Sequence, residues 1–158
     1  MEATSNELNS CLPFSTYPNK EDELRKSIWA GSNCRHDYGL RFIQETHQTC
    51  CAYCGKPLTE SYDAWVTMAI DHVVPVSVCR SLNIQMEFCR SLANMVLACA
   101  TCNGFDNRYK LTSDRKVSTF QEFLVLRDEI FITRRERIQR KHESERRFFA
   151  ENIVPDRA

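Results

Sequence analysis

The sequence lacks any apolar stretch long enough to cross a membrane. A membrane-spanning helix needs about 20 consecutive, mostly apolar residues, and no part of the 158-residue chain approaches that length. The first six residues, MEATSN, also lack the basic and apolar segments of a secretory signal peptide. We therefore expect a cytoplasmic protein with no membrane partner.

The chain also lacks a net charge of either sign. It contains 21 Lys and Arg residues and 21 Asp and Glu residues, so its overall charge does not demand a nucleic-acid partner. The basic residues are nevertheless concentrated toward one end: residues 1–104 carry 8 basic and 11 acidic side chains, whereas residues 105–158 carry 13 and 10. This small C-terminal excess permits binding to nucleic acid.

Cysteine, by contrast, is abundant. The chain has nine cysteines, an odd number that cannot pair completely into disulfides within one molecule. Four of them form two CxxC pairs, Cys51 with Cys54 and Cys99 with Cys102, which are separated by 44 residues. This spacing lets a tight turn direct two sulfurs at one ion, and Gly55 provides the permissive backbone that such a turn uses.

Two CxxC pairs predict one closed zinc site. Four thiolates complete a tetrahedral shell and leave no position for water, so this zinc would be structural and would stabilise the fold. A redox-active cysteine pair is the alternative, but it would need only one CxxC motif and a different surrounding pattern. The other cysteines have no partner at this spacing and are expected to be buried or free thiols: Cys11, Cys34, Cys50, Cys79 and Cys89.

Between the two pairs, the sequence predicts two short strands. Residues 65–70 are apolar and partly β-branched, and Asp71 and His72 continue this segment until Pro75 prevents regular pairing. Residues 94–98 form the second segment, which runs into the second CxxC pair. A helix is expected to follow from Asn103 to Lys110.

The flanking segments are predicted to be helical. An irregular arm over residues 1–19 precedes a helix from Asn19 to Trp29 that ends at Gly31, and a second short helix covers residues 37–47. We expect residues 1–35 to be an arm with a short helix, 36–112 the central domain and 113–158 a helical extension, all within one compact unit.

The C-terminal helix should start near residue 118. Ser118 with Gln121, or Thr119 with Glu122, can form its capping box. Its predicted apolar face follows a three-and-four spacing: Phe120, Phe123, Leu124, Arg127, Ile130, Phe131, Arg134 and Ile138. The later segment RRERIQRKHESERR mixes charges, which indicates a solvated face, a phosphate-contacting arm or a dimer-forming arm.

One tetrapeptide, CRSL, occurs twice, at residues 79–82 and 89–92. Two short copies are too few for a repeat architecture, so we treat the repetition of this tetrapeptide as chance.

The assembly of CxxC, DHVVP and NMVLACATCN resembles the HNH endonuclease family, also called ββα-metal or His-Me finger nucleases. The nine-residue step from Asn94 to Asn103 is similar to that in the HNH domain of RNA-guided CRISPR effectors. The resemblance covers residues 50–110. It implies an α+β protein with a small ββα-metal, treble-clef-like core stapled by zinc, flanked by short N-terminal helices and a long C-terminal helix.

The resemblance implies hydrolysis of DNA, with double-stranded DNA as the expected partner. His72 would be the general base that activates water, Asp71 and Asn103 would bind a catalytic Mg²⁺ or Mn²⁺, and Asn94 would organise the loop bearing His72. These residue types suit the chemistry: a neutral imidazole accepts a proton near pH 7, and carboxylate and amide oxygens are hard ligands for such ions.

The sequence departs from many relatives after Asn103. Where they carry a lysine in the pattern CNxxKG, this chain has Asp106 followed by Asn107. Arg108 or Lys110 would then replace the missing phosphate contact. Asn107, one turn after Asn103, is a further candidate ligand for the catalytic ion.

Two other interpretations compete with an endonuclease. One is a four-cysteine zinc module that binds nucleic acid or protein without catalysis, although such a module has no need of the Asp71–His72 pair. The other makes His72 a core histidine and Asp71 a turn cap. A homodimer is also left open, because one such unit cuts one strand at a site.

Overall fold

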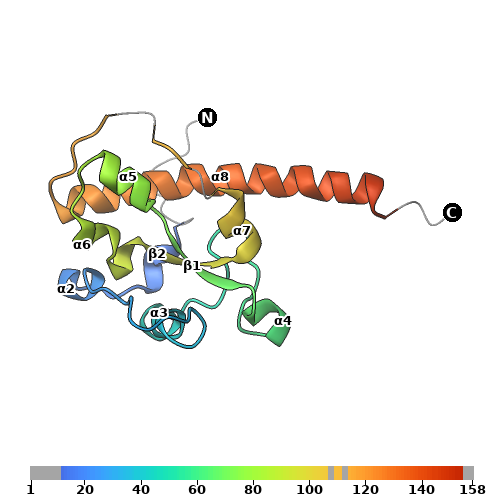
Figure 1. Ribbon diagram of the computed structural model, residues 1–158, viewed down its shortest axis with the longest axis horizontal. Coiled ribbons are helices and arrows are strands. Elements are labelled where there is room, and N and C mark those ends of the chain that lie inside the picture. Colours follow the sequence, from blue (N-terminus) through green and yellow to red (C-terminus); the bar gives the residue numbers. More distant parts are fainter. Residues whose placement is uncertain (1–11, 107–108, 112–113, 155–158) are drawn as a thin grey trace.

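Figure 1 shows the computed structural model of the chain, which describes residues 12–106, 109–111 and 114–154. The elements in chain order are η1 (Pro13–Thr16), α2 (Glu21–Leu24), α3 (Tyr38–Thr46), α4 (Tyr62–Trp65), β1 (Met68–His72), α5 (Val76–Ser81), α6 (Met86–Cys89), η2 (Leu92–Asn94), β2 (Met95–Cys99), α7 (Ala100–Phe105) and α8 (Phe120–Asn152). Among these helices, none combines the length and the apolar character needed to cross a membrane.

The two strands form an antiparallel pair at the centre of the molecule. Met68 lies opposite Cys99 and His72 lies opposite Met95. All five residues of β2 are buried. The predicted mixed fold with two short strands is therefore confirmed, except that the first strand begins at Met68. Residues 62–65 form α4 instead, because the Ser61 hydroxyl caps this turn by accepting the Ala64 N–H at 3.2 Å.

The helix after β2 begins earlier than the sequence predicts. The backbone N–H of Cys102 points at the Cys99 sulfur at 3.4 Å, so Cys99 caps a helix that starts at Ala100 and ends at Phe105. Lys110 is exposed and lies outside any helix. Two predicted site residues, Asn107 and Arg108, lie outside the described residues.

Helix α8 spans 33 residues and runs along one side of the body, with its C-terminal end projecting beyond it (Figure 1). Thr119 and Glu122 form the capping box, which selects the second of the two predicted caps. The buried residues follow the predicted face, with Leu126 in place of Leu124, and the last of them is Ile138.

The N-terminal helix is much shorter than predicted. It ends at Leu24, because the following segment pairs with another part of the chain: Ser27 bridges to Ser91, and the Leu92 N–H donates to the Lys26 carbonyl at 2.7 Å. Trp29 is thereby released from the helix and reaches the end of β1. Tertiary pairing has overridden the local helical preference here.

One hydrophobic core joins the three segments of the chain. It includes Tyr17 from the N-terminal segment, Phe42 and Leu97 from the middle, and Phe123 from α8. The first half of α8 therefore belongs to the same core as the strand pair.

Candidate metal centre and active site

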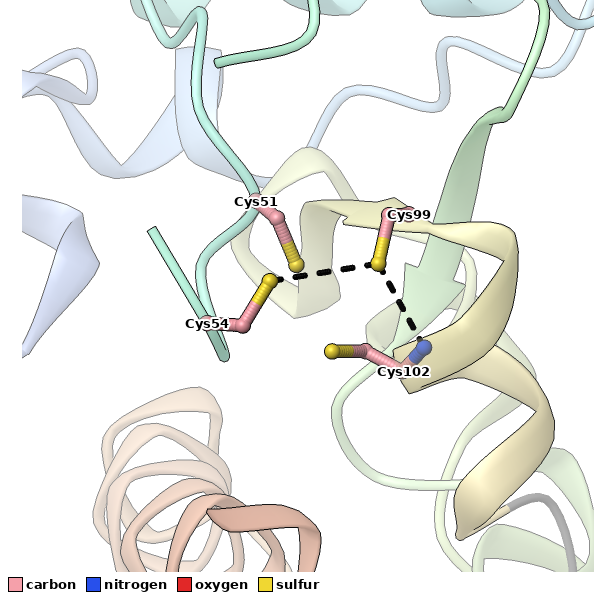
Figure 2. Close-up of side chains that lie close together, drawn as sticks. All are labelled: Cys51, Cys54, Cys99 and Cys102. Carbon is pink, nitrogen blue, oxygen red and sulfur yellow. Dashed lines mark hydrogen bonds between the residues drawn. The ribbon is translucent and has the colours of Figure 1, made fainter. Parts of the chain in front are cut away.

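Four thiols converge where the two CxxC pairs meet (Figure 2). Cys51 and Cys54 lie in a turn, Cys99 ends β2 and Cys102 lies in the first turn of α7. Their four sulfur atoms all lie within 4.8 Å of one another, and the Cys54 and Cys99 sulfurs are 3.9 Å apart. A tetrahedral zinc with Zn–S bonds near 2.3 Å has sulfur–sulfur edges of about 3.8 Å. The site therefore fits a structural zinc.

The first turn is built by its backbone. The Gly55 N–H donates to the Cys51 carbonyl at 2.8 Å, and the Ala52 N–H donates to the Leu97 carbonyl of β2 at 2.8 Å. Gly55 has a φ of 75°, a conformation that other residues adopt only with strain, while the space around it is open. The glycine is thus needed for its backbone conformation rather than for lack of room.

The thiols influence one another's ionisation. Hydrogen bonds from Cys102 and Cys51 lower the pKa of the Cys99 thiol. Cys50, which the sequence also places next to this turn, is exposed and lies outside the four-thiol cluster.

His142 of α8 completes the surroundings of this cluster. Its Nε2 atom lies 3.1 Å from the Cys102 sulfur, and its ring packs edge-on against Phe105 at 4.9 Å. The sequence analysis missed this residue because it lies in the mixed-charge segment of α8. The only available signal was a histidine among Lys, Arg and Glu residues.

His72 is the last residue of β1, and its imidazole is held by stacking. The ring lies parallel to that of Trp29, with centroids 5.0 Å apart. Burial lowers the pKa of His72 from its usual value; the Asp71 carboxylate opposes this effect, and the positive charges of Arg134 and Arg90 add to it. Neither ring nitrogen has a hydrogen-bond partner among the residues that the structure describes. The neutral imidazole is therefore available to accept a proton near pH 7.

The His72 ring faces a cleft of about 410 Å³. Besides His72, the cleft is lined by Ser27, Trp29, Val76, Arg80, Met86 and Arg90. Among these lining residues, the two arginines carry the charge, and it is positive. This lining therefore favours the binding of an anionic ligand.

Asp71 is held by two donors on the side of β1 that α8 covers. The Tyr53 hydroxyl donates to Oδ2 of Asp71 at 2.6 Å, and Nη2 of Arg134 lies 2.9 Å from the same oxygen. Burial and the Asp71 charge raise the pKa of Tyr53 well above its usual value, so its hydroxyl remains a donor. Within the described part of the chain, Oδ1 of Asp71 accepts no hydrogen bond.

Arg134 reaches this site from α8 and is almost completely buried, with a side-chain exposure of 1%. Its Nη1 donates to the carbonyls of His72 at 2.7 Å and Val73 at 2.9 Å. Its Nε lies 3.4 Å from a carboxylate oxygen of Asp106. The sequence signal for this role is an arginine at a position of the predicted apolar face of α8.

Asn94 is fully buried and fixes the segment that follows His72. Its Oδ1 accepts the Val74 N–H at 2.8 Å, while its Nδ2 donates to the carbonyls of Val74 at 3.0 Å and Cys89 at 2.9 Å. Its own carbonyl accepts the Val73 N–H at 2.8 Å. These contacts lie where an organiser of the His72 segment would act.

Asn103 lies half-buried in α7, one residue after Cys102, and α7 packs on both strands. Its side chain makes no hydrogen bond within the part of the chain that the structure describes. The free Oδ1 of Asp71 and the amide of Asn103 are hard oxygen donors, which suits Mg²⁺ or Mn²⁺. The donor set therefore fits the predicted ion, although the roles of these residues remain predictions.

Comparison with known proteins supports the motif. The family model described as HNH endonuclease matches residues 51–107, the segment that contains both cysteine pairs, Asp71, His72, Asn94 and Asn103. Comparison with the curated proteins and with the solved structures gave no significant match. Residues 51–107 therefore match the HNH endonuclease family model, and their four cysteines are positioned to bind a metal ion.

Proposed function

We propose that the protein is a metal-dependent HNH endonuclease that hydrolyses phosphodiester bonds in double-stranded DNA. The observation that carries this proposal is the state of His72: a stacked imidazole of lowered pKa, with both ring nitrogens free of described partners, faces an arginine-lined cleft. The family match over residues 51–107 supports the nuclease class.

In this proposal, His72 takes a proton from a water molecule in the cleft. The water oxygen then forms a bond to phosphorus while the bond from phosphorus to the leaving oxygen breaks. Stacking on Trp29 and the hydrogen bonds of Asn94 to Val74 hold the imidazole and its segment in place. A fixed base loses less freedom when the transition state forms.

Asp71, through its free Oδ1, and Asn103 would hold the divalent ion. When bound, Mg²⁺ or Mn²⁺ would neutralise charge that develops on the phosphate and the leaving oxygen. Arg134 already offsets part of the Asp71 charge, so we expect weak ion binding without DNA and stronger binding when phosphate oxygens complete the shell.

The structural zinc and the divalent ion would thus be separate. Zinc at Cys51, Cys54, Cys99 and Cys102 would fasten α7 to the turn before the strands, and so hold Asn103 near β1. Because the thiols must stay reduced to bind zinc, we propose an intracellular location. We propose 36–112 as the catalytic domain, between an N-terminal arm and a C-terminal extension.

A cleavage assay tests this function. Supercoiled, linear and single-stranded DNA would be incubated with Mg²⁺, with Mn²⁺ or without added metal. We expect metal-dependent nicking, and a loss of about 10²-fold to 10⁴-fold in rate for His72→Ala, because general-base catalysis typically contributes that much. His36→Ala, which removes an exposed histidine, is the matched control and should cut normally. Equal cutting by both variants would refute the role of His72.

The ion pair between Arg134 and Asp71 favours one alternative. If this arginine keeps the carboxylate from binding an ion, the protein would be a zinc module that binds nucleic acid without cutting it. DNA that is bound but stays intact with every metal would support this second candidate. If the protein does cut, a second copy of the chain that binds through the projecting end of α8 would allow cleavage of both strands at one site.

A further inference from the structure

The two CRSL segments share two local features, although the sequence alone suggested a chance match. Cys79 and Cys89 are both fully buried. The hydroxyls of Ser81 and Ser91 both donate to the carbonyl three residues earlier, at 3.0 Å and 2.7 Å. Each copy therefore lies at the end of a short helix: α5 ends at Ser81 and α6 ends at Cys89.

The cysteines of the two copies face each other inside the protein. The Cys89 thiol raises the pKa of the Cys79 thiol, and α5 packs against α6. Since each arginine directly follows one of these cysteines, the buried pair places Arg80 and Arg90 on a common side. Both arginines line the cleft that His72 faces.

Both guanidinium groups are available in this cleft. Arg80 and Arg90 are exposed, and neither guanidinium group forms an ion pair or a hydrogen bond with any residue that the structure describes. Glu87 of α6, which could pair with Arg90, is instead held by Arg25 at 2.9 Å. The cleft also contains an unused donor, because the indole N–H of Trp29 is buried without an acceptor in the described part of the chain.

We propose that Arg80 and Arg90 form a phosphate clamp that grips the DNA backbone on either side of the phosphate presented to His72. Two unpaired guanidinium groups around one cleft suit successive phosphates of a nucleic-acid strand, because each offers a planar fork of donors to phosphate oxygens. This clamp rests on the proposed function, since it places the substrate backbone over the catalytic histidine.

The salt dependence of DNA binding tests the clamp. All variants would carry His72→Ala to prevent cleavage, and binding to a labelled short duplex would be measured by fluorescence anisotropy between about 50 and 200 mM salt. The slope of log K against log salt is negative, and each lost phosphate contact decreases its steepness by about 0.9 for duplex DNA. We expect that decrease for Arg80→Gln and again for Arg90→Gln, and about twice as much for the double variant.

Matched variants separate the clamp from general charge effects. Arg41→Gln removes one positive charge from the exposed side of α3 and should leave the slope unchanged. Arg80→Lys and Arg90→Lys keep the charge and should retain the slope, and thermal melting confirms that each variant is folded.

Three results would overturn the proposal. If the parent binds DNA and the glutamine variants show its full slope, the backbone lies elsewhere and only the clamp fails. An equal decrease for Arg41→Gln would also overturn the clamp alone. If the folded parent does not bind duplex DNA at all, both the clamp and the proposed substrate fail.

Discussion

At the scale of a single residue, Arg134 connects the C-terminal helix to the end of β1. It donates to the carbonyls of His72 and Val73 and forms ion pairs with Asp71 and Asp106, all within a buried environment. A buried arginine is stable only when such partners compensate for its lost hydration. Removing it would leave Asp71 in the protein interior without its counter-ion, whereas Asp106 would keep its ion pair with Arg137 at 3.0 Å.

We therefore predict that Arg134→Met strongly destabilises the protein. Breaking a buried ion pair on one side typically costs about 3 to 5 kcal/mol, because the partner charge remains buried. Urea denaturation followed by circular dichroism would measure the change. Arg140→Met, an exposed substitution on the same helix, should change the stability by less than about 0.5 kcal/mol. A comparable loss for the two variants would contradict the structural role of Arg134.

Tyr53 provides a test of Asp71 as an ion ligand. Tyr53→Phe removes the hydroxyl that donates to Asp71 Oδ2 and keeps the ring, which stacks on Phe131 at 5.4 Å. Loss of a donor to a ligand typically weakens metal binding or activity about 10-fold to 100-fold. We expect the Mg²⁺ concentration for half-maximal cleavage to rise by about that factor.

The control for this substitution is Tyr62→Phe, at a tyrosine that is 73% exposed. It should leave the Mg²⁺ titration unchanged. An unchanged titration for Tyr53→Phe as well, with cleavage intact, would indicate that Asp71 does not hold the ion.

At the scale of elements, α8 also supports the metal centre through His142. With zinc bound, Cys102 would be a thiolate, and an N–H from His142 Nε2 would stabilise its charge at the observed 3.1 Å. We predict that His142→Ala weakens zinc binding about 10-fold to 100-fold without unfolding the protein. Competition with a coloured chelator would measure the affinity.

Arg140→Ala is the matched control for the zinc experiment, because it shortens an exposed side chain two residues earlier on the same helix. It should release zinc at the same chelator concentration as the unmodified protein. If His142→Ala does so too, the contact with Cys102 contributes nothing to zinc binding.

Elements with strong local signals were predictable from the sequence. The CxxC spacing predicted the thiol cluster, apolar and β-branched residues predicted the strand pair, and the capping box with its apolar spacing predicted α8. The N-terminal helix was predicted too long, because pairing of Ser27 with Ser91 depends on contacts that no local pattern encodes. For the same reason, the sequence did not reveal that α5 and α6 direct Arg80 and Arg90 into one cleft.

Partners distant in sequence were the least predictable part of the candidate site. His72 and Asp71 stood out as polar residues in an apolar segment, but Trp29 and Arg134, which contact them, lie 43 and 63 residues away from the respective partner. Buried arginines are particularly hard to foresee, since a charge on an apolar face usually indicates the edge of that face. Here it indicates an internal ion pair.

At the scale of the whole molecule, α8 has two parts with different surroundings. Residues up to Ile138 are buried at regular intervals, whereas the projecting part carries exposed apolar side chains, including Phe148 at 59% and Phe149 at 53% exposure. At 1.5 Å per residue the helix is about 50 Å long, so it is longer than the segment that packs into the core. The first part should therefore stabilise the core, and the second should not.

Two truncations test this division of α8. A chain that ends at His142 keeps Arg134, Ile138 and the contact with Cys102, so its free energy of unfolding should stay within about 1 kcal/mol of the full chain. A chain that ends at Phe131 loses the ion pairs of Arg134 and the buried Ile138, and it should not fold cooperatively in a circular-dichroism melt. Cooperative unfolding of the shorter chain, or loss of folding in the longer one, would show that the core depends on a different part of α8.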